Sequence, residues 1–251
     1  MAVSQEKAAQ ALLLWYEAMG ADEAIGEAPL DCFAVAAAQP PAPRPIARVR
    51  PAPAQSSSGA RPGEASTLAE LEALAGSFDG CALKRTAKSL CFARGSHAAR
   101  LMLIGEAPGR DEDLRGRPFV GRAGQLLDRM LAAIGLTEEH VYITNTVYWR
   151  PPGNRTPTPE EVEACAPFLA RQIELLAPQA LLLLGGAAAK NILGVTEGIM
   201  RLRGKWLNYA CASGSIATLA TLHPAYLLRN PEAKRYAWRD LLSVKAALEK
   251  P

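Results

Sequence analysis

Four polar side chains stand at or near the ends of apolar segments in this 251-residue chain. Glu106 follows "LMLIG", Asn145 ends "HVYITN" and His223 ends "SIATLATLH", while Asn154 lies in the loop after the second of these segments. An imidazole that titrates near neutral pH can donate a hydrogen bond to a developing negative charge. A carboxamide offers both a donor and an acceptor to a planar polar edge. Ordinary turns do not need these four groups together, so the set predicts a reactive site.

The loops around these residues suit a nucleic-acid ligand. Phe119 lies in "GRPFVGRAG", a glycine- and arginine-rich segment of the kind that lets backbone approach phosphates. A carboxamide that pairs with an imide edge, a ring that stacks on it and a cationic surround are suited to a flipped base. The chain has no Ser-His-Asp arrangement and no H-x-E with C-x-x-C of a zinc deaminase, and "GEAPG" matches neither common phosphate-loop pattern. Excision of a base without a metal is the reaction class that remains.

Strands that alternate with helices must position these residues. Apolar patterns predict strands near 100–105, 140–148, 180–186 and 215–223, and helices over 66–76, 123–136, 158–177, 187–194 and 233–250. This alternation predicts an α/β three-layer sandwich, with a central, mainly parallel four-stranded sheet and helices on both faces. Ligands bind beyond the carboxyl ends of parallel strands, so we expect the four polar residues at one edge of the sheet.

Composition divides the chain into three regions. Residues 1–35 form an N-terminal segment with an amphipathic helical pattern over 6–20, residues 36–65 a Pro-, Ala- and Arg-rich linker, and residues 66–251 the α/β domain. The early apolar run "ALLLWY" is too short to span a bilayer, and no signal-peptide pattern is present. We therefore expect a soluble cytoplasmic protein without membrane association.

Charge and cysteine content set further limits. The net charge of +3 is too small to identify a nucleic-acid binder. Residues 201–239 hold seven basic residues against Glu232, which leaves two readings open, a solvated basic face and a phosphate-binding surface. The five cysteines are odd in number and widely spread, so we expect reduced thiols rather than a disulfide framework.

Three segments carry a resemblance to a known family. They are "LMLIGEAPGRDEDLRGRPFVGRAGQLLDRMLAAIGL", "RPPGNRTPTPEEVEACAPFLARQI" and "TLHPAYLLRNP". Over roughly residues 78–248 the chain resembles the family-four uracil-DNA glycosylases. The resemblance implies their fold and a monofunctional enzyme of base excision repair. Such an enzyme flips uracil out of DNA, hydrolyses its N-glycosidic bond and leaves an abasic site.

The resemblance also implies residue roles. His223 would stabilise the charge on uracil O2, Asn145 would read the uracil edge, and Phe119 would stack on the base. Ala107 stands where related glycosylases carry a water-activating Asp, so the group that handles water stays open among Glu106, Glu112 and Asn154. Glu112 could equally be only an acid at a helix N-terminus, where the helix dipole favours it. The implied set is His223, Glu106, Glu112 and Asn154 for catalysis; Phe119, Asn145, Ala107 and Gly105 for uracil; and Arg229, Leu227, Leu228, Arg122 and Gly109 for DNA. Leu227 or Leu228 would wedge into the base stack, with ordinary core packing as the alternative for both, and Arg229 would meet a phosphate.

The sequence departs from the family at its four-iron cluster, which four cysteines hold. Cys81 and Cys165 match two ligand positions, but Lys84 and Trp149 stand at the other two. Such a cluster is held by four thiolates, and Cys91 lies seven residues beyond Lys84, too far to substitute. We therefore expect no iron–sulfur cluster and no other metal or cofactor, with Trp149 filling the vacated volume and Lys84 pointing outward.

Two other functions stay open. A relative without catalysis could only bind DNA or a partner, and a shifted preference could favour hypoxanthine or xanthine. Glu106, Phe119, Asn145 and His223 disfavour the first, and Asn145 disfavours the second. "YWRPPGNRTP" contains no His of the kind that a related branch uses for covalent trapping. We expect a monomer that acts on uracil-containing DNA, single- or double-stranded, in the bacterial nucleoid, with the N-terminal segment as the place for a protein partner.

Overall fold

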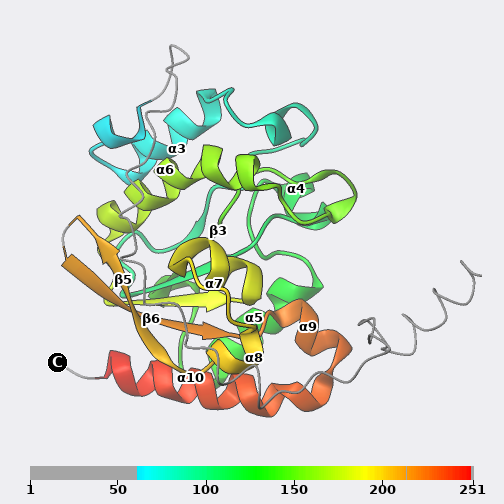
Figure 1. The fold of residues 1–251 in the computed structure, drawn as a ribbon, viewed down its shortest axis with the longest axis vertical. Coiled ribbons are helices and arrows are strands. Elements are labelled where there is room, and N and C mark those ends of the chain that lie inside the picture. The colour runs from blue at the N-terminus through cyan, green and yellow to red at the C-terminus, as the bar shows by residue number, and fades with distance from the viewer. Residues whose placement is uncertain (1–60, 213, 250–251) are drawn as a thin grey trace, which may run out of the picture. The chain divides into compact units, whose positions relative to one another are not determined.

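In the computed structural model, which describes residues 61–212 and 214–249, six strands form one sheet (Figure 1). They are β1 (Arg94–Gly95), β2 (Leu101–Gly105), β3 (Val141–Asn145), β4 (Ala180–Leu184), β5 (Trp206–Cys211) and β6 (Gly214–Thr221), in the order β1-β3-β2-β4-β6-β5. β3, β2, β4 and β6 are parallel neighbours, and β1 and β5 pair antiparallel at the two edges. The predicted parallel sheet is confirmed, with two edge strands beyond the four that the sequence predicts.

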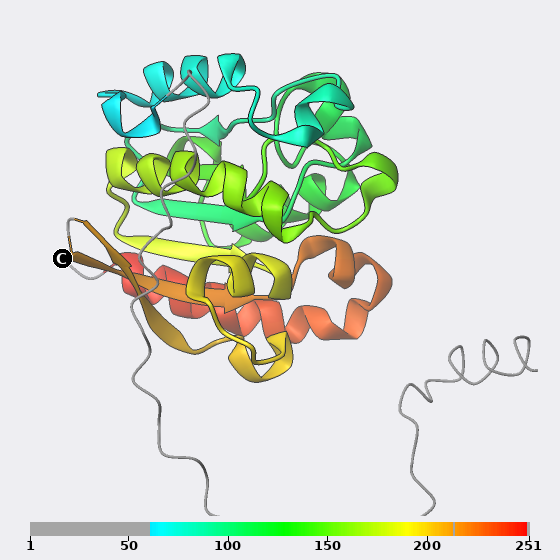
Figure 2. The same cartoon turned by 45° about the horizontal axis from the view of Figure 1, so that its top comes forward.

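The central strands carry apolar side chains on both faces of the sheet, and helices cover both faces. Leu101 and Leu103 of β2 point to one face, Met102 and Ile104 point to the other, and all four are fully buried. The first face is covered by α5 (Arg122–Ala133) and α10 (Lys234–Leu248); the second by α6 (Pro159–Leu176), α7 (Gly186–Leu193) and α8 (Ile199–Leu202) (Figure 2). The predicted three-layer α/β sandwich is therefore confirmed.

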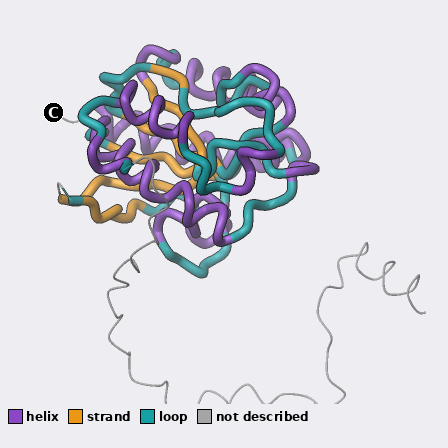
Figure 3. Tube along the Cα trace, turned by 90° about the horizontal axis from the view of Figure 1, so that it is seen from above, coloured by secondary structure: helices purple, strands orange, loops and turns teal. Residues whose placement is uncertain are grey.

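Shorter elements complete the domain around this sandwich (Figure 3). The α-helices are α3 (Leu68–Ser77), which packs on α6, α4 (Arg110–Arg115) after β2, and α9 (Pro224–Arg229) after β6; the 3-10 helices are η1 (Pro62–Glu64), η2 (Ala82–Arg85), η3 (Glu138–His140), η4 (Pro152–Asn154) and η5 (Pro231–Ala233). Thr158 begins α6 with a reciprocal cap, in which its amide donates to the Glu161 carboxylate at 2.8 Å. The sequence predicts neither α4 nor the 3-10 helices as separate elements.

The predicted boundary between linker and domain moves toward the N-terminus. Ala65 is 2 % exposed, and its carbonyl accepts hydrogen bonds from Arg171 of α6 at 3.0 and 2.7 Å. Residues 62–65 are therefore part of the domain, because these contacts fix them to α6. The remaining predictions for 1–35 and 36–60 lie outside the described residues. None of the described helices is long and apolar enough to cross a membrane.

Candidate active site

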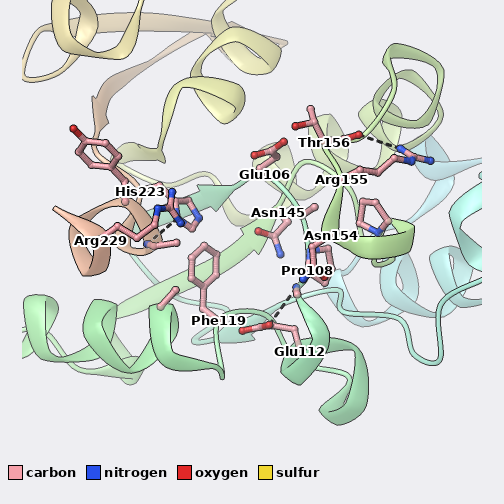
Figure 4. A pocket seen from close by; sticks show the side chains of 16 residues that line it. Glu106, Pro108, Glu112, Phe119, Asn145, Asn154, Arg155, Thr156, His223 and Arg229 are labelled. Carbon is pink, nitrogen blue, oxygen red and sulfur yellow. Dashed lines mark hydrogen bonds between the residues drawn. The ribbon is translucent and has the colours of Figure 1, made fainter. Parts of the chain in front are cut away.

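A cavity of about 520 Å³ opens at the carboxyl ends of the parallel strands. Its wall contains Glu106, Asn145, Asn154 and His223, the four polar residues that the sequence predicts at one edge of the sheet. Figure 4 shows Glu106, Phe119, Asn145 and His223 around the same space. The turn after β2, the end of β3, the loop before α6 and the start of α9 each contribute, so the predicted convergence is present.

Asn145 is the most deeply buried polar side chain in this wall. It ends β3, is 1 % exposed, and neither Oδ1 nor Nδ2 has a hydrogen-bond partner among the described residues. The neighbouring strand ends at Gly105, where a Cβ atom would lie 2.5 Å from Asn145 Oδ1 and 2.5 Å from Phe119 Cζ. Buried polar atoms are nearly always paired, so an unpaired carboxamide that faces a cavity indicates a ligand with a complementary edge. Gly105 leaves the space that this arrangement requires.

Phe119 forms the wall beside this carboxamide. Its ring centroid lies 5.7 Å from that of His223, with 32° between the ring planes, and the side chain is 6 % exposed. The residue has φ of 55°, a left-handed conformation that bulky side chains rarely adopt. The start of α5 packs against it so closely that a Cβ on Gly124 would lie 1.7 Å from the Phe119 carbonyl oxygen. The packing of α5 thus holds the ring where a planar ligand can stack.

Glu112 has a structural task that does not fit the role of water activator. Its Oε1 accepts hydrogen bonds from the amides of Val120 and Gly121 at 2.9 and 2.8 Å. Its Oε2 accepts from the amide of Gly109 at 3.2 Å, at the N-terminus of α4. The carboxylate therefore joins the turn after β2 to the loop that carries Phe119. Gly109, which the sequence predicts to contact DNA, lines the cavity, but its amide is bound to Glu112.

Glu106 and Asn154 differ in what their oxygen atoms bind. Glu106 Oε1 is buried and has no hydrogen-bond partner within the described part of the chain. The backbone of Glu106 is fixed, because its carbonyl accepts from the Thr146 hydroxyl at 2.7 Å. Asn154 Oδ1 accepts instead from Arg150 Nε at 2.7 Å. Of the three groups proposed to handle water, Glu106 has the carboxylate oxygen that is left to bind it.

His223 is held as a neutral imidazole with a defined donor. It caps α9, and its Nδ1 accepts a hydrogen bond from the Ala225 amide at 3.1 Å. A neutral ring that accepts at Nδ1 carries its proton on Nε2. Burial, together with a smaller effect of Arg229, lowers the pKa of His223 to about 4. The ring can therefore donate from Nε2 at neutral pH without carrying a positive charge.

The loop between β3 and α6 is fixed by an ion pair at its far end. Arg155 lines the cavity, and its guanidinium makes two hydrogen bonds to the Glu161 carboxylate, at 2.8 and 2.6 Å. Glu161 is 7 % exposed, and the bonds from Arg155 hold its pKa below the usual range. Arg155 therefore serves the shape of the loop that carries Asn154.

The side chains predicted to contact DNA lie in different environments, and only some of them are exposed. Leu227 is fully buried and packs with Leu126 and Ala237, so of its two predicted roles core packing is confirmed and the wedge into DNA is wrong. Leu228 is half-buried and lines a separate apolar groove beside α10. Arg229 is exposed and lines the cavity, and Arg122 is exposed at the first turn of α5, outside the cavity wall. Sequence reasoning missed Tyr226, which is 37 % exposed and does line the cavity.

Cys81 and Cys165 lie together in a buried apolar cluster with Trp149, which is 3 % exposed. The neighbouring Cys165 thiol lowers the pKa of the Cys81 thiol. Lys84 turns away from them, since its Nζ donates to Asp79 Oδ1 at 2.7 Å and to a backbone carbonyl at 2.8 Å. No group of three or more His, Cys, Asp or Glu side chains within residues 61–212 and 214–249 could hold a metal ion.

Comparison with known proteins places this site in a family. The profile of the Uracil DNA glycosylase superfamily matches residues 92–242, which include the strands β2 to β6 and all of the cavity wall. The chain belongs to the uracil DNA glycosylase superfamily. It is 44% identical over 158 residues to the type-4 uracil-DNA glycosylase of Archaeoglobus fulgidus, covering 61% of this chain and 79% of the relative.

Two further members of this superfamily show how far the similarity extends. The type-4 uracil-DNA glycosylase of Thermotoga maritima is 40% identical over 173 residues, or 68% of this chain and 88% of that protein. A type-5 uracil-DNA glycosylase of Pyrobaculum aerophilum is 34% identical over 151 residues, or 53% and 64%. The type-4 relatives therefore match at higher identity and over more of their length.

Proposed function

We propose that this chain is a uracil-DNA glycosylase that hydrolyses the N-glycosidic bond of an extruded uridine and leaves an abasic site. One observation carries the proposal. The buried Asn145 carboxamide has unpaired donor and acceptor atoms among the described residues and faces a cavity that Phe119 and His223 also line. The names of the type-4 relatives support the same activity. As a DNA glycosylase the protein acts on DNA.

Recognition of the base rests on complementarity to one edge. Uracil presents a carbonyl acceptor beside an N–H donor, so the Asn145 amide nitrogen can donate to the carbonyl while its oxygen accepts from the N–H. In this orientation of the carboxamide, cytosine, which exchanges these functions, would leave both atoms of a buried group unpaired, which costs free energy. Phe119 supplies the stacking face, and Gly105 keeps the slot between Phe119 and Asn145 open.

His223 supports departure of the base. As the glycosidic bond breaks, negative charge develops on the uracil O2 atom, and the Nε2–H donor of a neutral imidazole stabilises it. The donor is preorganised, because Nδ1 is bound to the Ala225 amide and His223 lies so close to the end of β4 that a Cβ on Gly185 would be 3.0 Å from His223 Cβ. Such a donor accelerates a reaction without reorganisation at the moment of bond cleavage.

Glu106 is the carboxylate that we assign to the attacking water. Glu106→Gln is expected to lower single-turnover excision by about 100-fold, at the lower end of the range for a general base. Glu112→Gln is the matched control. Because the Glu112 carboxylate accepts three backbone amides, its amide variant is expected to lower the unfolding temperature more than it lowers excision per folded molecule. Equal rate losses in both variants, measured on protein verified as folded, would contradict this assignment.

We further propose that the enzyme works without an iron–sulfur cluster. The donor set does not fit a four-thiolate cluster, because Lys84 and Trp149 replace two cysteines and Trp149 packs against the two that remain. Protein purified without exposure to oxygen is expected to contain no stoichiometric iron or sulfide. Lys84→Cys combined with Trp149→Cys restores the four-cysteine pattern and serves as the reference in the same reconstitution. About four iron atoms per wild-type chain would contradict the proposal.

The activity itself is tested with a labelled oligonucleotide that carries one uracil, with and without chelator. Cleavage of the strand only after alkali treatment is expected, and chelator should leave the yield unchanged. An oligonucleotide with thymine at the same position controls for nuclease activity. Absence of an alkali-labile product on both single and double strands would contradict the function.

A further inference from the structure

α9 presents one exposed aromatic side chain to the cavity, and this side chain is Tyr226. It is 37 % exposed and lines the cavity together with His223 and Arg229 of the same short segment. Its amide donates to the His223 carbonyl at 2.9 Å, so the Tyr226 backbone is fixed directly to the residue that caps the helix. Tyr226 therefore lies at the cavity wall on a backbone whose position is fixed.

The neighbouring leucines point elsewhere. Leu227 is fully buried between α5 and α10, and Leu228 lines the apolar groove that contains Trp238. Neither leucine lines the cavity. Extruding a base from a duplex unstacks its neighbours, and protein side chains inserted at such steps compensate part of that cost. An exposed aromatic ring beside the cavity can stack on any of the four bases, because every base has a π-face.

We propose that Tyr226 enters the base stack beside the extruded uridine and so sets the rate on double-stranded DNA. The inference rests on the proposed uracil excision. A duplex holds the uracil by pairing and by stacking on both sides, so a side chain that replaces the lost stacking matters most there. A single strand needs no such replacement, since its bases are already free to leave the stack.

The test compares Tyr226→Ala, Tyr226→Phe and wild type in single-turnover excision from single-stranded and double-stranded oligonucleotides of the same sequence. Tyr226→Ala is expected to slow duplex excision by about 10- to 100-fold, and single-strand excision by less than about threefold. Tyr226→Phe keeps the ring and should keep the duplex rate. Trp238→Ala removes an exposed aromatic ring outside the cavity wall and should leave both rates unchanged.

Fluorescence of 2-aminopurine placed next to the uracil gives a second readout. It should report unstacking by the wild type and by Tyr226→Phe, but weaker unstacking by Tyr226→Ala. Equal losses on both strand types, no loss at all, or a duplex-specific loss in Leu228→Ala instead would overturn the inference. A wild-type protein inactive on both substrates would contradict the proposed uracil excision as well. An active wild type with an unaffected Tyr226→Ala variant would contradict only the insertion of Tyr226 into the base stack.

Discussion

Replacing His223 with leucine is expected to slow single-turnover uracil excision by about 10²- to 10³-fold, the usual cost of removing one preorganised donor to a developing oxyanion. Leucine removes the Nε2–H donor and the Nδ1 acceptor of the Ala225 amide together. His97→Leu changes an exposed imidazole outside the cavity wall and is the matched control. If His223→Leu, verified as folded, excised uracil within about threefold of wild type, the assigned role would be wrong.

The pH dependence provides a second check on the same residue. The pKa of His223 is lowered from 6.5 to about 4, so the ring stays neutral down to about that pH. The wild-type single-turnover rate should therefore show no effect of His223 protonation near pH 6.5. An effect should appear only as the pH approaches 4, where the protonated Nδ1 can no longer accept from the Ala225 amide that positions the ring. Because the unfolded chain binds this proton more readily, His223 also makes folding stability rise with pH between about 4 and 6.5. A rate inflection near 6.5 that disappears in His223→Leu would contradict a neutral donor.

Replacing Asn145 with aspartate is expected to lower excision of uracil by about 10³-fold or more, since a site built around a hydrogen-bonded edge strongly rejects a ligand that cannot complete it. The carboxylate has no donor for the uracil carbonyl and places negative charge against it. The same carboxylate can accept from the cytosine amino group. The variant should therefore change the ratio of cytosine to uracil excision in favour of cytosine.

A control for the aspartate substitution comes from the edge of the sheet. Asn208→Asp makes the same chemical change at an exposed position of β5 and should alter neither rate nor base preference. Both variants are measured on oligonucleotides that differ only in the target base. Retention of uracil excision by Asn145→Asp within about tenfold of wild type would contradict the pairing that we assign to this carboxamide.

The central sheet could be predicted because its strands are strongly apolar and alternate with helices. "ALLLL" of β4 and "LMLI" of β2 are buried on both faces, which leaves an uninterrupted hydrophobic signal. The edges give no such signal. β1 has only two residues. β5 has only half-buried and exposed positions, so its sequence lacks the apolar signal of a core strand, and its conformation depends on pairing with β6.

The candidate site was predictable to the extent that it follows from the ends of parallel strands. Glu106, Asn145 and His223 meet for that reason. The sequence could not decide between the core and DNA for Leu227, because the side of the six-residue α9 that faces the core depends on α5 and α10, which are distant in sequence. The same packing turns Tyr226 outward. The role of Glu112 also depends on tertiary structure, since two of its three amide partners lie eight and nine residues beyond it.

The most direct test of uracil excision identifies both products of one reaction by mass spectrometry. Duplexes that carry uracil, hypoxanthine, xanthine or cytosine at one position are incubated with excess wild-type protein. We expect free uracil together with an intact strand that contains one abasic site, and little or no release of the other bases. Preferential release of hypoxanthine or xanthine, or no free base from any duplex or from the matching single strands, would contradict the proposed uracil excision.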